Sequence, residues 1–60
     1  MDSIPQKLLT GDEVAEILQV SRSYAYQLIR EKQIKAVRLG RAVRVRPEDL
    51  TLFINNSLQN

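Results

Sequence analysis

The chain concentrates side chains that can bind phosphate in its middle. Between Val20 and Arg46 it has eight lysines and arginines and a single glutamate, whereas the other residues hold one lysine against six acidic side chains. A cationic stripe on a small domain is typical of a protein that binds a nucleic-acid backbone. The basic residues are Arg22, Arg30, Lys32, Lys35, Arg38, Arg41, Arg44 and Arg46. This segregation predicts a polyanionic partner and disfavours a merely solvated surface.

The sequence offers little for catalysis or metal binding. Its 60 residues include no histidine and no cysteine, which removes the commonest general base and the commonest zinc ligands. The acidic residues are spread along the chain, and no glycine-rich phosphate loop occurs. We therefore expect no enzyme activity, no cofactor and no metal site.

The length allows one small domain, here residues 1–60, with a limited core. No apolar run approaches the roughly 18 residues that span a membrane, and no secretion leader is visible. We expect a cytoplasmic, nucleoid-associated protein that does not bind membranes. Residues 1–6 and 57–60 are expected to be loose.

Two short helices should position the basic residues. Thr10 and Glu13 have the spacing of a capping box, and an apolar stripe follows them, which predicts a helix over about 11–18. Ser21 suits the N-cap of a second helix, over about 22–32. The turn between them is three residues long, so the pair is predicted to form a helix-turn-helix.

The second helix has an apolar side and a polar side. Ala25, Leu28 and Ile29 define the buried direction. The opposite direction carries Ser23, Gln27 and Arg30, with Tyr24 and Tyr26 on the flanks. Glutamine can pair with adenine and arginine with guanine, so Gln27 and Arg30 are the best candidates for reading bases. Arg22 is a candidate phosphate contact. Tyr26 is equally suited to a hydrogen bond from its hydroxyl to a phosphate or to partial burial against the wing, the hairpin that follows in the chain.

A change to alternating residues after Lys35 predicts a β-hairpin around Gly40. To keep its apolar residues on one face, the hairpin should pair Leu39 with Val43 and Val37 with Val45, through the odd loop 40–42. The other face would then carry Arg38, Arg44 and Arg46, with Arg41 at the tip.

The remaining elements complete the expected fold. Pro47 suits the first position of a third helix, and Leu8 and Leu9 an extended segment. We predict a mainly α fold with a small β-hairpin: a winged helix-turn-helix with three short helices and a wing. The expected core is Val14, Ile17, Leu18, Leu28, Ile29, Val37, Val43, Leu50 and Phe53.

Several stretches together resemble a known family. They are LTGDEVAEILQVSRS at 9–23, YQLIR at 26–30, Ile34, VRLG at 37–40, VRV at 43–45 and PEDL at 47–50. This series is similar to excisionase-family DNA-binding domains, within the wider MerR-like winged helix-turn-helix group, and covers about residues 8–54. The resemblance implies that the second helix enters the major groove and that the wing reaches the backbone or the minor groove.

Matched position by position, the resemblance marks ten DNA-binding candidates. They are Arg22, Ser23, Tyr24, Tyr26, Gln27 and Arg30 on the helix, and Arg38, Gly40, Arg41 and Arg44 on the wing. Tyr24 stands where the family more often has a small hydroxyl residue, and Ala25 where it has a larger aliphatic one. Tyr24 either reaches DNA or folds back over Ala25, so the family's base preference does not carry over.

We expect a sequence-specific binder of double-stranded DNA. The resemblance favours an excisionase, a recombination directionality factor of a mobile element, that works with an integrase or recombinase or with further copies of itself. A small transcriptional regulator of the same fold is the alternative. An adaptor that binds an acidic protein is the alternative from another class.

Overall fold

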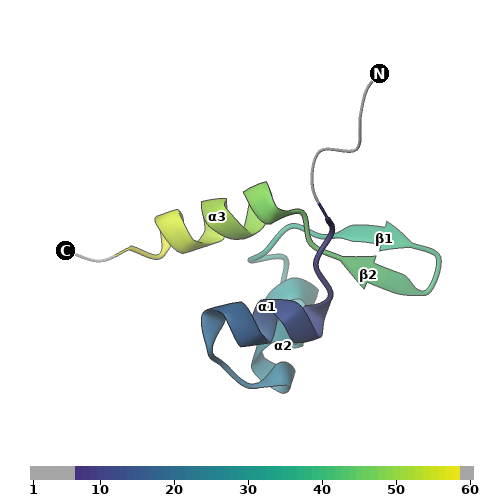
Figure 1. Ribbon diagram of the computed structural model, residues 1–60, viewed down its shortest axis with the longest axis horizontal. Helices are drawn as coiled ribbons and strands as arrows, with labels where there is room; N and C mark the ends of the chain where they lie inside the picture. The colour runs from purple at the N-terminus through teal and green to yellow at the C-terminus, as the bar shows by residue number, and fades with distance from the viewer. Residues whose placement is uncertain (1–6, 59–60) are drawn as a thin grey trace.

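A computed structural model describes residues 7–58, which form a winged helix-turn-helix (Figure 1). The expected fold class is confirmed. The elements are, in order, α1 (Gly11–Leu18), α2 (Arg22–Arg30), β1 (Val37–Leu39), β2 (Ala42–Arg44) and α3 (Pro47–Asn56). The expectation that residues 1–6 are loose lies outside the described residues, as does the same expectation for 59 and 60.

Reciprocal hydrogen bonds cap the start of α1, as the sequence predicts. The Thr10 hydroxyl accepts a bond of 3.0 Å from the Glu13 amide, and the Glu13 carboxylate accepts one of 2.9 Å from the Thr10 amide. These bonds satisfy two amides that have no partner within the helix. Gln19 then ends α1 in the left-handed region, at φ 59°, and turns the chain toward α2.

The helix α2 begins where predicted but ends two residues early. The Ser21 hydroxyl accepts a hydrogen bond of 3.1 Å from the Tyr24 amide, which caps the helix. At the other end, Lys32 adopts φ 64°, which is incompatible with a right-handed helix. The chain turns there and brings Ile34 into the core, where it is 1% exposed.

All three helices and the segments that flank the hairpin contribute to one small core. Its buried apolar members are Val14, Ala15, Ala25, Leu28, Ile34, Val45 and Leu50. The expectation that Ile17 belongs to the core is wrong, because its side chain is 52% exposed. The buried side of α1 is centred between Val14 and Ala15, and Ile17 points roughly 110° away from that direction at 100° per residue.

The predicted hairpin register is wrong by one residue. The observed pairs are Val37 with Arg44, Arg38 with Val43, and Leu39 with Ala42, so the loop contains two residues, Gly40 and Arg41. Gly40 adopts φ 63°, whereas Arg41 has no positive φ. This combination is typical of the type II′ turn, which connects the two strands of a hairpin through a two-residue loop.

The register differs because the valines do not need a common apolar face with Leu39. Val45 is buried through a bridge to Leu9, with two backbone hydrogen bonds of 2.8 Å, which confirms the extended segment before α1. Leu39 stays 52% exposed, so no core face constrains it. Side chains of paired residues share a face, and Arg38 and Arg44 therefore lie on opposite faces of the hairpin.

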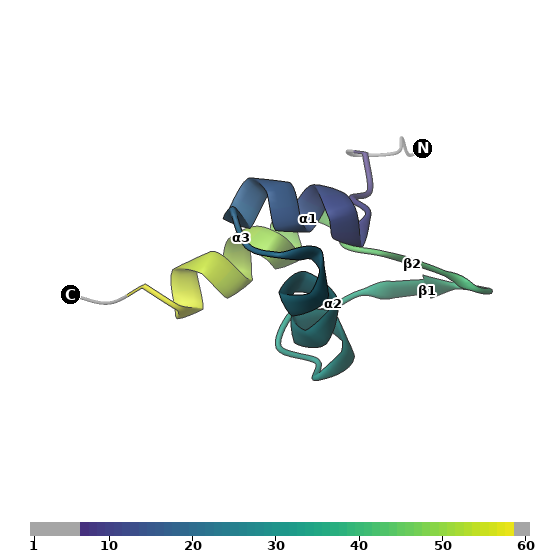
Figure 2. The ribbon, with the colours of Figure 1, turned by 90° about the horizontal axis from the view of Figure 1, so that it is seen from below.

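The hairpin and α3 extend from opposite ends of the molecule. Figure 1 and the view from below in Figure 2 both show the hairpin projecting beyond the crossed helices α1 and α2, with α3 leading away on the other side. The hairpin tip is thus held out from the body of the domain.

Candidate nucleic-acid interface

The outward face of α2 has the composition that the sequence predicts. Ser23, Gln27 and Arg30 are exposed, whereas Ala25 and Leu28 on the opposite side are buried. The Gln27 amide donates a hydrogen bond of 3.1 Å to the Glu31 carboxylate one turn later. This bond is at the surface, so a base edge can replace it at low cost.

The two tyrosines of α2 have different surroundings. Tyr24 is 47% exposed, whereas the ring of Tyr26 packs against the first turn of α1. A Cβ atom on Gly11 would lie 2.3 Å from Cζ of that ring, and the Tyr26 hydroxyl donates a hydrogen bond of 3.4 Å to Asp12. Glycine at position 11 therefore lets the two helices approach each other at this point.

The same carboxylate holds Arg22 at the start of α2. The Nε atom of Arg22 donates a hydrogen bond of 2.8 Å to Oδ1 of Asp12, and this bond and charge raise the pKa of the guanidinium above its usual value. Asp12 thus accepts from one of the guanidinium donors of Arg22, the residue for which a phosphate contact was expected. The sequence shows Asp12 only as an acidic residue in a helix's first turn, so nothing in it indicated this contact.

The wing places its three arginines differently. Arg38 shares a face with Val43, and both line a groove of about 370 Å³ between α2 and the hairpin. Arg41 lies at the tip, and Arg44 lies on the opposite face, where its Nη1 donates a hydrogen bond of 2.9 Å to the Val43 carbonyl. The groove is lined by Ile29, Lys32, Ile34, Lys35, Ala36, Arg38 and Val43.

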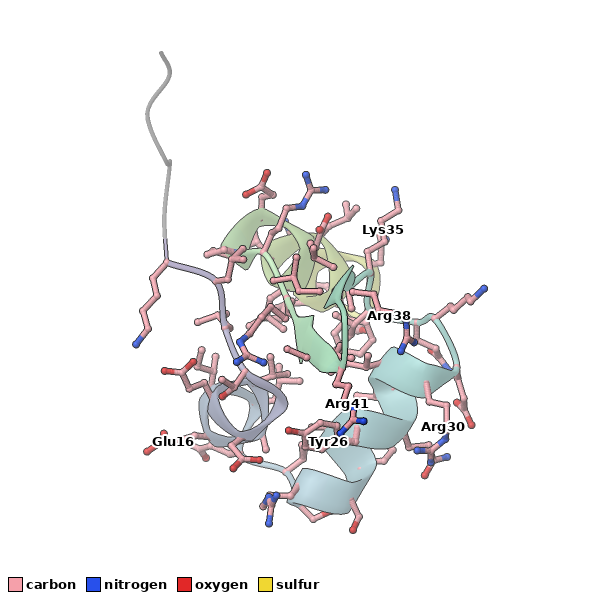
Figure 3. The ribbon with its side chains drawn as sticks, turned by 90° about the vertical axis from the view of Figure 1, so that its right-hand side faces the viewer. Glu16, Tyr26, Arg30, Lys35, Arg38 and Arg41 are labelled. Atoms are coloured by element: carbon pink, nitrogen blue, oxygen red, sulfur yellow. The ribbon has the colours of Figure 1, made fainter. Side chains whose placement is uncertain are left out.

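Figure 3 shows several of the basic residues on one side of the molecule. Arg30, Arg38, Arg41 and Lys35 lie on the side of α2 and the hairpin, and Glu16 lies on the far side of α1. Within residues 7–58, no acidic oxygen lies within 4.0 Å of the charged nitrogens of Arg30, Arg38 or Arg41. These three guanidinium groups are available to an external anion.

The fold and this arrangement agree with a comparison to known families. The family model described as a helix-turn-helix domain matches residues 8–57. The chain belongs to the helix-turn-helix domain family. This membership supports DNA as the partner of the basic side. No curated protein and no solved structure matches the chain.

Residues 7–58 bring no three potential metal ligands together, and none of their helices has the length and apolarity needed to cross a membrane. The two lysines Lys32 and Lys35, which the sequence marks only as general contributors of charge, line the groove beside Arg38.

Proposed function

We propose that this helix-turn-helix domain binds double-stranded DNA in a sequence-selective manner and without catalysis. The observation that carries the proposal is the group Arg30, Arg38 and Arg41, which lacks acidic partners within residues 7–58 and shares one side with the outward face of α2. A helix fits the major groove, and unpaired arginines neutralise phosphates.

The residues divide by the DNA group that they would contact. Gln27 and Arg30, on the outward face of α2, would read base edges through paired hydrogen bonds. Arg38 and the lysines of the groove would hold the backbone strand between the helix and the wing. Ser23 and Tyr24 stand next to the base-reading pair, and Gly40 and Arg41 form the part of the wing that reaches farthest.

For the biological role we propose an excisionase of the MerR-like winged group, which directs recombination of a mobile element together with a recombinase or with further copies of itself. The resemblance of residues 8–54 supports this role, and the small winged domain suits it. A transcriptional regulator would use the same surface. An excision assay with the cognate integrase separates the two, because a regulator would leave excision unchanged.

Binding should be tested on a duplex selected from a random pool and on a scrambled duplex of equal length. Arg30→Ala and Gln27→Ala should each weaken binding to the selected duplex by about 1–3 kcal/mol and affect the scrambled one much less. Lys7→Ala is the matched control for Arg30, because Lys7 is exposed but bonded to Glu13 at 3.2 Å.

Salt dependence tests the contribution of the backbone. The logarithm of the binding constant should fall linearly with the logarithm of salt, by roughly 0.9 for each phosphate that the protein neutralises. Equal affinity for the selected and scrambled duplexes would contradict sequence reading. Tighter binding to an acidic peptide than to any duplex would instead indicate a protein adaptor.

A further inference from the structure

The tip of the hairpin exposes a large apolar side chain. Leu39 is 52% exposed, and it is not among the residues that pack against the core. Single exposed leucines are common on proteins and usually need no explanation. This one differs because it lies beside Arg41 on an element that projects from the domain (Figure 2).

The tip is also slender. Of the four residues 39–42, two have long side chains, Leu39 and Arg41. The partner of Leu39 across the hairpin is Ala42, which is too small to cover it. The Cβ position of Gly40 has no atom within 4 Å, so the turn faces open space on that side. Such a tip suits the minor groove, which is about 6 Å wide.

Charge brings this tip to DNA. Arg41 lies on the same side as Arg38 and Arg30 (Figure 3), so the basic side that would attract the backbone ends at the turn next to Leu39. The pairing of Leu39 with Ala42 places the Leu39 side chain on the other face of the hairpin, which it shares with Arg44. The negative potential of the minor groove attracts arginine. Proteins that bind there frequently insert an apolar side chain between two base pairs and partly unstack them.

We propose that Leu39 is a specificity-determining wedge that enters the minor groove at one base step and partly unstacks it. The proposal rests on the DNA binding proposed above. Arg41 anchors the tip by its charge, and Leu39 leaves water for the gap between the bases. Because pyrimidine–purine steps unstack most easily, Leu39 favours a TA step at the wing position over a stiff AA step.

The test compares duplexes that share the selected site and carry a TA step at successive positions of the flank, or AA throughout. Leu52→Ala is the matched control, since Leu52 is 51% exposed but lies on α3. The wild type and Leu52→Ala should prefer one TA position by at least about 5-fold, the lower end for a single base-pair change. Leu39→Ala should lose this preference.

A second measurement detects the unstacking itself. With 2-aminopurine as the purine of the preferred step, the wild type and Leu52→Ala should increase its fluorescence on binding, and Leu39→Ala should not. Leu39→Thr, which suits a strand but lacks an apolar end, should behave as Leu39→Ala. Circular dichroism serves as the control that both variants are folded.

The outcomes separate the wedge from DNA binding. If the wild type discriminates the selected from the scrambled duplex but shows no TA preference, the wedge is wrong and the proposed function stands. The wedge is equally wrong if Leu39→Ala keeps both the preference and the fluorescence change. Failure of the wild type to bind any duplex would overturn both proposals.

Discussion

The ring of Tyr26 lies over Gly11, so closely that a Cβ atom at position 11 would meet three ring atoms at 2.3–2.8 Å. The first turn of α1 and the middle of α2 thus approach each other through a glycine and an aromatic ring. Because Tyr26 is 37% exposed, the ring has room to swing outward when it is displaced.

Gly11→Ala should therefore displace the ring and destabilise the domain by about 1 kcal/mol, at the lower end for overpacking. Thermal unfolding of four proteins checks this: the wild type, each single variant and the double variant with Tyr26→Ala. The cost of Gly11→Ala should disappear when Tyr26 is alanine. An unchanged cost in that background would mean that the strain lies in the backbone of residue 11.

Asp12 and Arg22 lead to a prediction about affinity. Asp12→Asn replaces the carboxylate that accepts the 2.8 Å bond from Arg22 by a neutral amide, so the negative charge that competes with phosphate for this guanidinium is lost. We expect the Asp12→Asn variant to bind DNA more tightly than the Glu16→Gln variant, which loses the same charge from the same helix. The ion pair between Asp12 and Arg22 is exposed, so Arg22 can exchange the carboxylate for a phosphate at low cost.

Titrations of a fluorescent duplex at one salt concentration check this difference. In an Arg22→Ala background, Asp12→Asn should increase the DNA affinity by no more than Glu16→Gln does. If Asp12→Asn and Glu16→Gln increase the DNA affinity equally with Arg22 present, the effect is one of net charge. Asp12 then does not compete with DNA for Arg22.

The surroundings of Asp49 predict how the stability of the folded domain depends on pH. Its carboxylate is buried beside Arg46, which donates hydrogen bonds of 2.6 and 3.1 Å, and these bonds hold the pKa of Asp49 below its ordinary value of 3.8. A carboxyl group with a depressed pKa stabilises the folded state above the pKa of the unfolded chain. That contribution is lost as the pH falls through the folded-state value.

Asp49→Asn should accordingly lower the melting temperature at neutral pH and lower it progressively less as the pH falls below 3.8, the ordinary pKa of the carboxyl group. The measurement is thermal unfolding of both proteins across this range. Glu48→Gln is the control, since its carboxylate is exposed and lies 3.7 Å from the same arginine. A melting difference that does not change with pH would mean that Asp49 acts by packing alone.

The opposite faces of the hairpin predict unequal roles for two wing arginines. Arg38 lines the groove next to α2, whereas Arg44 lies on the other face and donates to the Val43 carbonyl. Arg38→Ala should reduce the salt slope of DNA binding by about 1, the loss of one phosphate contact. Arg44→Ala removes the same charge and should change the slope less.

Salt titrations of both variants on one duplex provide this comparison, with circular dichroism to verify the fold. Equal slopes for the two variants would mean that both arginines contribute equally to the neutralisation of phosphates. Such a result would contradict a face-specific contact by the wing.

The sequence alone determined the local elements and their order. The limits of α1, the caps at Thr10 and Ser21, and the start of α3 at Pro47 follow from hydrogen bonds and backbone preferences that act within a few residues. The outward face of α2 followed from helical geometry once Ala25 and Leu28 marked the buried side. These features depend on little that is distant in the chain.

Tertiary structure decided the contacts between distant segments. The hairpin register depends on the bridge from Leu9 to Val45, which buries that valine and frees Leu39 from the core. The Asp12–Arg22 bond and the Tyr26–Gly11 contact depend on how α1 crosses α2. Alternation along one strand cannot show which residues a distant partner will cover, so only the packed fold sets Arg38 and Arg44 on opposite faces.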